Sequence, residues 1–302
     1  MTTTAVALLS AALAATPPGA ASDALHGKCT SKVKGACFEL GLALDTGDGV
    51  EADAAGAAGA FLRACEQGDM RGCNSAGVML RRGRGAPRDT ARARTLVKQA
   101  CDAKLAVGCF NLGAMVASGE GGPRAPAEAM RLFDLACTAD LGPACTAAGT
   151  LALDSRPSAP TRALTFFTTA CRLNDGEGCY NQGQLYRAGG SGKPQPRVAF
   201  RTYKKACRLG VAAGCNWIGL MLASGEGAKA RPAKAVEWLH KACDGGFAEG
   251  CFNAAVAYVK GNGVGKDHQQ AGRLFTRACK GGVDQACKLL ERQKRRKRPK
   301  PR

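Results

Sequence analysis

The sequence predicts an all-α solenoid, a right-handed superhelix of αα-hairpins that are cross-linked by disulfides. Three observations predict it. The chain has 16 cysteines among its 302 residues. They form pairs eight residues apart that recur every 36 residues, with one interval of 34, and apolar residues recur at helical spacing inside the intervals. A fixed period of this length is typical of solenoids, because each repeat buries its apolar face only against its neighbours.

Two helices are predicted in each repeat. The second, longer helix carries apolar residues at i, i+4 and i+7, as at Ala93, Val97 and Ala100, and this spacing places them on one helical face. The first helix begins at the second cysteine of a pair and has glycine at its centre in six repeats, with Ala255 in the seventh. Because glycine in mid-helix costs about 1 kcal/mol relative to alanine, its recurrence predicts close approach of a neighbouring helix. The glycines are at positions 41, 77, 113, 149, 183 and 219.

Glycine-rich segments separate the two helices of a repeat, for example residues 118–126 and 261–267. Prolines near the start of the second helix fit this assignment, because the first helical position does not need a backbone N–H. These prolines are at positions 87, 126, 160, 196 and 232. The fourth repeat is two residues short and its segment 153–160 lacks glycine, so we expect a tighter loop there.

The cysteines of each pair are predicted to form a disulfide with one another. On one straight helix, positions eight apart would be separated by about 12 Å, whereas a disulfide requires Cα atoms about 4.4 to 6.8 Å apart. The chain must therefore reverse between the two cysteines, joining the second helix of one repeat to the first helix of the next. The predicted pairs are Cys29–Cys37, Cys65–Cys73, Cys101–Cys109, Cys137–Cys145, Cys171–Cys179, Cys207–Cys215, Cys243–Cys251 and Cys279–Cys287.

Other uses of the cysteines fit the sequence less well. Pairing across a hairpin, such as Cys37 with Cys65, strands Cys29 and Cys287 at opposite ends of the array, although sequence alone does not determine connectivity. Structural zinc sites space their cysteines more closely and bring four ligands together, and the redox motif C-x-x-C does not occur. We therefore predict no metal and no cofactor.

The chain is strongly basic, with a formal net charge of +19, and its last fifteen residues contain nine Lys or Arg and one Glu. We expect residues 288–302 to comprise the end of a closing helix and a basic, disordered tail, because two prolines prevent a helix from reaching the end. An anionic surface or an acidic protein is the predicted partner of this tail. Nucleic acid is not expected, because no aromatic residues interleave for base stacking. The alternative is a solvated tail without a partner.

The repeat motif is A-C-x7-C-x-x-(L/I/A)-G, then G-x-G, then A-x-x-(L/F/W)-(F/L/V)-x-x-A-C. It resembles the motif of cysteine-rich Sel1-like repeat proteins, secreted bacterial relatives of the tetratricopeptide repeat, over residues 29–287. The resemblance implies a solenoid of seven disulfide-linked helix pairs over residues 23–287, and a scaffold for protein–protein interaction. It also implies an alternative, because some members have been described as penicillin-binding proteins or weak β-lactamases.

The N-terminus predicts export. Residues 5–15 are an apolar run too short to span a bilayer and are followed by small residues, as in a secretory signal. We therefore expect a signal peptide over residues 1–22 and a periplasmic or secreted protein without a transmembrane segment. A mitochondrial intermembrane space is the alternative oxidising compartment. An alanine-rich leader on a cytosolic protein would leave sixteen thiols in a reducing environment, which fits the composition less well.

No catalytic constellation is predicted. Ser31 and Lys34 match the S-x-x-K spacing of penicillin-recognising enzymes, but the other motifs of those enzymes are absent. The match also lies between Cys29 and Cys37, where a turn is predicted. We interpret it as a chance match, and we expect a chain that is not an enzyme.

A binding surface is predicted on the first helices, which in arrays of this kind line a concave face that binds a protein or peptide ligand. The candidate residues lie two or six positions after the cysteine that opens the helix. They are Asn111, Asn181, Trp217, Met221 and Asn253. The alternative is structural, with each Asn bonding to a neighbouring turn and the Met/Leu column packing in the core. Recurrence favours that alternative, because repeats share structural positions.

Overall fold

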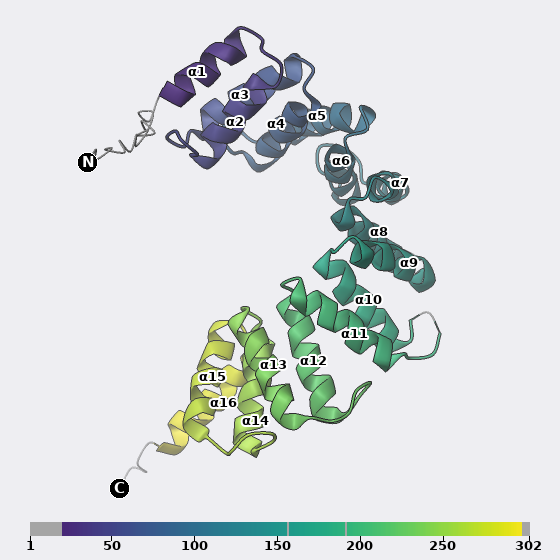
Figure 1. Cartoon of the computed structure of the whole chain (residues 1–302), viewed down its shortest axis with the longest axis vertical. Helices are drawn as coiled ribbons and strands as arrows, with labels where there is room; N and C mark the ends of the chain where they lie inside the picture. Colours follow the sequence, from purple (N-terminus) through teal and green to yellow (C-terminus); the bar gives the residue numbers. More distant parts are fainter. Residues whose placement is uncertain (1–19, 156, 191, 298–302) are drawn as a thin grey trace, which may run out of the picture. The chain divides into compact units, whose positions relative to one another are not determined.

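The computed structural model describes residues 20–155, 157–190 and 192–297, which form sixteen helices and no strands (Figure 1). The chain divides into two compact units, residues 1–125 and residues 126–302. The predicted all-α repeat solenoid cross-linked by disulfides is therefore confirmed. The sequence analysis treats residues 23–287 as one solenoid, and the repeat period itself does not mark the division at residue 125.

We call the first helix of a repeat the A helix and the second the B helix. The first unit contains α1 (Ala20–Thr30), A helices α2 (Ala36–Thr46), α4 (Met70–Arg82) and α6 (Ala106–Ser118), and B helices α3 (Ala54–Glu66) and α5 (Thr90–Asp102). The second unit contains A helices α8 (Gly142–Asp154), α10 (Gly176–Ala188), α12 (Ala212–Ser224), α14 (Ala248–Lys260) and α16 (Asp284–Lys297). Its B helices are α7 (Pro126–Thr138), α9 (Pro160–Arg172), α11 (Pro196–Arg208), α13 (Pro232–Asp244) and α15 (His268–Lys280).

The glycine at the centre of the A helix provides the close approach that its recurrence predicts. A Cβ atom on Gly41 would lie 2.5 Å from the ring of Phe61, and one on Gly149 would lie 2.5 Å from the ring of Phe167. Both rings are almost completely buried. In these two repeats the B helix therefore places an aromatic ring over a bare stretch of A-helix backbone. The surrounding core consists mainly of alanine, leucine and cysteine side chains.

The loops between A and B helices follow two patterns. Most A helices end at a glycine with positive φ, as at Gly83 and Gly225. The fourth repeat differs as predicted: its loop runs from Ser155 to Ala159, and Ser155 adopts an extended backbone instead. Pro160 opens α9 directly after this short loop, and prolines likewise open α7, α11 and α13.

The start of the array differs from the sequence expectation. The predicted signal peptide lies mostly outside the described residues, but α1 begins at Ala20 and continues to Thr30, where no helix is predicted. Leu25 of α1 packs against the first core cluster. At the other end, the closing helix α16 continues to Lys297, and the last residues of the expected tail lie outside the described part of the chain. Lys, Arg, Gln and Leu are good helix formers, and the first proline of the tail comes only at position 299.

Candidate functional site

All sixteen cysteines are paired locally, as predicted. The eight disulfides join cysteines eight residues apart, with Cα–Cα distances of 4.3 to 4.9 Å. The alternative pairing of Cys37 with Cys65 is therefore not formed. In each turn the chain reverses through a residue with positive φ located five positions before the second cysteine, for example Lys104 and Gly210. Within the described residues, no cluster of three or more His, Cys, Asp or Glu side chains could hold a metal ion.

The asparagines of the predicted binding row bond to the preceding A helix. Asn111 Nδ2 donates to Asn74 Oδ1 over 2.8 Å in the first unit, and Asn253 Nδ2 donates to Asn216 Oδ1 over 2.9 Å in the second. These bonds join consecutive A helices rather than a helix and a neighbouring turn, and each uses one N–H group of its donor. An amide side chain has two N–H groups and a carbonyl oxygen. Half-buried Asn111 and Asn253 therefore retain hydrogen-bonding capacity.

Trp217 is the centre of an aromatic and charged group in the second unit. Its ring stacks on that of Tyr203 from α11, with centroids 5.9 Å apart and an interplanar angle of 14°. The Arg187 guanidinium of α10 lies 4.1 Å from the centroid of the Trp217 ring. Arg187 also pairs with Glu226 at 3.3 Å. Trp217 is half-buried, so the indole and the guanidinium together form part of the surface of the unit.

Beneath this group, Tyr203 is fully buried and donates a hydrogen bond from its hydroxyl to Gln184 Oε1. Burial raises the pKa of Tyr203, because the phenolate would lose its hydration. Tyr203 is therefore a neutral hydrogen-bond donor at physiological pH. It fixes Gln184, which is itself half-buried on α10, beside Arg187.

Met221 does not take part in this surface. Its side chain is completely buried and belongs to the core cluster that contains Ile218 and Leu222. The structure therefore corrects the prediction that Met221 anchors a ligand. The cause is packing from two sides, because an A helix contacts both a B helix and another A helix, and the column of Met221 lies inside that contact. Asn181 is half-buried on α10.

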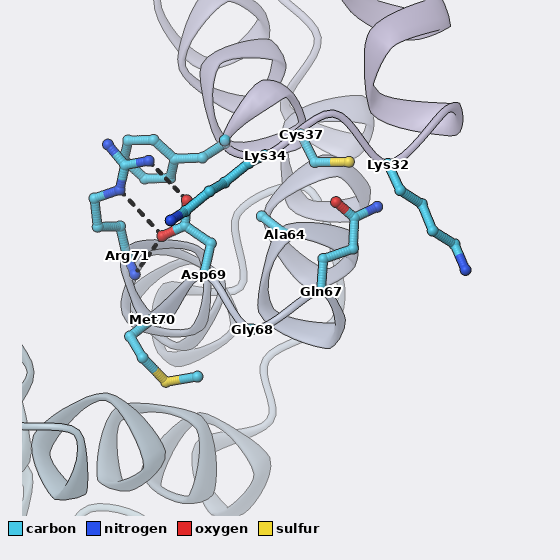
Figure 2. Close-up of a pocket in the computed structure, with 11 residues that line it drawn as sticks. Lys32, Lys34, Cys37, Ala64, Gln67, Gly68, Asp69, Met70 and Arg71 are labelled. Carbon is cyan, nitrogen blue, oxygen red and sulfur yellow. Dashed lines mark hydrogen bonds and ion pairs between the residues drawn. The ribbon is translucent and has the colours of Figure 1, made fainter.

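A pocket of about 340 Å³ lies between the first two disulfide turns of the first unit. Figure 2 shows its lining, with Lys32 and Lys34 on the first turn and Asp69 and Arg71 at the start of α4. Phe38 forms one wall, and the Arg71 guanidinium lies 4.3 Å from the centroid of its ring.

The charges of this pocket are only partly balanced. Arg71 donates from Nε and Nη2 to the two carboxylate oxygens of Asp69 over 3.0 and 2.7 Å, and the Arg71 backbone N–H donates to the same carboxylate. The bonds from the Arg71 side chain hold the pKa of Asp69 below its usual value. Lys32 and Lys34 have no ion pair within the described part of the chain. The pocket can therefore bind an anionic group, but its side chains include no activated nucleophile.

Ser31 and Lys34 are separated in their surroundings. Both lie in the exposed turn between α1 and α2. Lys34 lines the pocket of Figure 2, but Ser31 is not part of its lining. A penicillin-recognising serine needs a base and an oxyanion-binding site around its hydroxyl, and an exposed turn residue has no such enclosure.

The family model described as Sel1 repeat matches residues 35–69, 71–105, 106–141, 176–211, 212–247 and 248–283, which is more than half of the chain. The chain belongs to the Sel1 repeat family. The segment between residues 141 and 176 is not matched, and it contains the shortened fourth repeat. Sel1 repeat proteins are generally scaffolds without enzymatic activity that mediate protein–protein interaction.

Two solved structures with TM-scores above 0.7 support the same fold. A Sel1 repeat protein from Oxalobacter formigenes is 20% identical, covers 90% of this chain and 80% of its own, and has a TM-score of 0.76. The protective antigen c5321 of uropathogenic Escherichia coli, which displays an SLR fold, is 25% identical with a TM-score of 0.74, covering 89% of this chain. This chain spans 58% of the length of c5321. Cysteine-rich protein B of Helicobacter pylori is 30% identical over 43% of this chain and 93% of its own, with a TM-score of 0.37.

No protein with a curated description matches this chain. None of the helices in the described ranges has the length and apolar character needed to cross a membrane. The eight disulfides of these Sel1 repeats indicate an oxidising, extracytoplasmic environment.

Sequence reasoning missed the partners of the indole group. Arg187 and Tyr203 come from the preceding repeat, 30 and 14 positions before Trp217. Tyr203 belongs to the recurring apolar column four positions before the first cysteine of each pair, but that column does not mark it as a partner of Trp217, and no column marks Arg187. The two residues also occupy different positions of the repeat, Arg187 eight positions after Cys179 and Trp217 two positions after Cys215, so the sequence carries no signal that pairs them.

Proposed function

We propose that this Sel1 repeat protein is an exported scaffold that binds a segment of a protein partner across the exposed faces of α10, α12 and α14. The observation that supports the proposal is the half-buried group of Arg187, Trp217 and Asn253 on three successive A helices of one unit. We expect this face to be the concave one, as in related repeat arrays.

The chemistry of this face suits an extended peptide. Trp and Arg are enriched among the residues that dominate binding energy at protein interfaces, and here the guanidinium lies directly over the indole ring. The amides of Asn253 and Gln184 can each donate and accept hydrogen bonds, which matches the alternating N–H and C=O groups of an extended backbone. Asn181 adds a further amide on α10. In the first unit, Asn111 occupies the corresponding position with Asn74 as its partner.

The disulfides support export as part of this proposal, and we assign residues 1–22 to a signal peptide. The periplasm or the exterior is the proposed location, with a mitochondrial intermembrane space as the alternative. The basic residues after position 288, which begin on α16, are proposed to attract an acidic protein or an anionic surface. Their effect acts over about 8 Å at physiological salt.

The test is capture of protein partners by the oxidised chain from an extract of its native compartment. The variant Trp217→Ala removes the indole that carries the group, and it should abolish capture of a specific band that the unchanged chain retains. Leu209→Ala is the matched control, because Leu209 is also a partly exposed apolar residue of the second unit but lies in a disulfide turn. Circular dichroism of both variants checks that the helices are intact.

Equal capture by Trp217→Ala and by the unchanged chain would contradict the proposal that this face binds. Equal loss with Leu209→Ala would also contradict it, because the loss would then follow from general surface apolarity. Pocket residues of the first unit provide a second comparison. Since Lys32 and Lys34 lie on a different unit, replacing them with Gln should leave capture by the α10–α14 face unchanged.

A further inference from the structure

A second pocket, in the other unit, is lined by charged residues of one sign. It has a volume of about 290 Å³ and lies between α11, α13 and the loop of residues 225–231, and we call it the α11–α13 pocket. Its lining residues are Phe200, Lys204, Leu222, Ala228, Lys229, Arg231, Lys234 and Trp238. Four of these eight residues carry a positive charge and none carries a negative charge, so the pocket lining has a net positive charge.

The four cations come from three separate elements. Lys204 is on α11, Lys229 and Arg231 are on the loop, and Lys234 is in the first turn of α13. None of the four has an ion pair within the described residues, in contrast to Arg187 and Arg277 of the same unit, which pair with acidic partners. Like charges that surround one pocket repel each other, and the repulsion is relieved when an anion enters.

Nearby carboxylates do not neutralise the pocket. Glu226 lies in the same loop but forms an ion pair with Arg187, which belongs to the α10–α14 face. Glu237 follows Lys234 by three positions on α13 and is exposed, but it does not line the pocket. The positive charge of the four cations is therefore available to a ligand.

The floor of the pocket is apolar. Leu222 is buried, and Phe200 and Trp238 are half-buried members of the adjoining core cluster. The Lys241 ammonium lies 5.5 Å from the centroid of the Trp238 ring, which adds a fifth cation beside the floor. A ligand that fits must place an apolar group against the rings and negative charges at the rim. A small inorganic anion satisfies only the second condition.

We propose that the α11–α13 pocket binds an acidic segment of a protein partner, with an apolar side chain on Phe200 and Trp238 and flanking carboxylates paired with the four cations. Cations on three elements match several carboxylates spaced along a chain better than a single compact anion. The pocket also lies apart from the α10–α14 face, since its lining shares no residue with the Arg187 and Trp217 group. This inference rests on the proposed scaffold function, because it identifies one chemistry of the partner.

The experiment uses Trp238 as a reporter in the full, oxidised chain. The protein has two tryptophans, so the variant Trp217→Phe leaves Trp238 as the sole source of indole fluorescence. A peptide of sequence Glu-Asp-Phe-Glu-Asp with blocked ends is titrated, beside the neutral peptide Gln-Asn-Phe-Gln-Asn. We expect the acidic peptide to change Trp238 fluorescence saturably. Its affinity should be at least tenfold lower at 0.3 M than at 0.05 M salt, because salt screens several charge pairs.

The double variant Lys204→Gln/Lys234→Gln should weaken binding of the acidic peptide at least tenfold. Its matched control is Lys260→Gln/Lys280→Gln, which removes the same charge from exposed positions of the same unit that lie outside the pocket and should change affinity less than twofold. Equal weakening in the two double variants would overturn the inference, because binding would then follow only net charge. Equal affinity for the neutral peptide would overturn it as well.

Two further titrations distinguish other anions. Inorganic phosphate and vesicles containing an anionic phospholipid are added in place of the peptide. If either changes Trp238 fluorescence as strongly as the acidic peptide and loses its effect in Lys204→Gln/Lys234→Gln, the pocket is a site for that anion and the peptide proposal is wrong. The scaffold proposal is tested separately, since Trp217→Ala acts on partner capture and Lys204→Gln/Lys234→Gln acts on this pocket. Partner capture that survives the loss of peptide binding would leave the scaffold function standing alone.

Discussion

Gly85 is the position at which one added methyl group has a large and separable predicted effect. It lies in the loop after α4 with φ of +72°, and a Cβ atom there would overlap the carbonyl oxygen of Ala54 and lie 3.0 Å from the amide nitrogen of Ala55. These atoms belong to the start of α3 in the preceding repeat. Because they are backbone atoms of a helix, they cannot move aside as a flexible side chain would.

Two costs add at this position in Gly85→Ala. A left-handed backbone conformation costs a non-glycine residue about 1 to 2 kcal/mol, and forcing extra atoms into a packed contact typically costs about 1 to 3 kcal/mol more. We therefore expect the free energy of unfolding of the first unit to fall by about 2 to 5 kcal/mol. The contact that is lost joins consecutive repeats, so hydrogen exchange should also speed up at the start of α3.

Gly49 provides the matched control within the same unit. It occupies the equivalent loop position one repeat earlier, with φ of +70°, but nothing lies within 4 Å of its added Cβ. Gly49→Ala should therefore cost only the backbone term of about 1 to 2 kcal/mol. The assay is denaturant unfolding of the oxidised chain, monitored by circular dichroism. Amide hydrogen exchange is measured for each residue. Equal destabilisation by the two substitutions would refute the reasoning that the glycine permits contact between repeats.

The remaining predictions concern redox state, charge and catalysis. The intact mass of the oxidised protein, leaving aside any leader, should be sixteen hydrogens below that of the reduced chain, and a peptide link between Cys37 and Cys65 would contradict the structure. Asp69→Ala should lower stability by about 1 kcal/mol by removing the N-cap of α4. Because Arg71 lowers the pKa of Asp69, the ionic part of that contribution is fully present above the usual value of 3.8 and is lost as the pH falls through the lowered pKa, so the gap in melting temperature between the two proteins should narrow in acid. Hydrolysis of a chromogenic β-lactam should stay at background and be the same in Ser31→Ala, and turnover that this substitution abolishes would overturn the scaffold function. Deleting residues 293–302 should slow association with anionic vesicles and flatten its salt dependence without changing thermal stability, whereas equal binding at low salt would show that the tail is inert.

The start of the array shows where sequence reasoning fails for a local reason. At the start, α1 is too short and too weakly amphipathic to be recognised by its pattern alone. It is helical beside a partner against which Leu25 packs.

The sequence by itself determined the repeat, the helix pairs and the disulfides, because these depend on residues that are close along the chain. A turn of seven residues between two cysteines leaves few geometries, and the local pairing used all sixteen thiols. The central glycine of the A helix likewise predicted close approach of a neighbouring helix, because a residue that destabilises the helix interior recurs in six repeats. The five proline positions also indicated the starts of B helices, because the first helical position does not need a backbone N–H. Four of them open such a helix.

Only the tertiary structure decided which side chains reach the surface. Trp217 and Met221 are four positions apart on α12, so they lie on the same side of that helix. Trp217 is nevertheless half-buried beside Arg187, whereas Met221 is completely buried. Which column is covered depends on how two other helices pack against α12, and that packing is absent from the sequence of α12. The same reason hides the α11–α13 pocket: Lys204 and Lys234 are thirty residues apart, and only the stacking of one repeat on the next brings their charges to a common apolar floor.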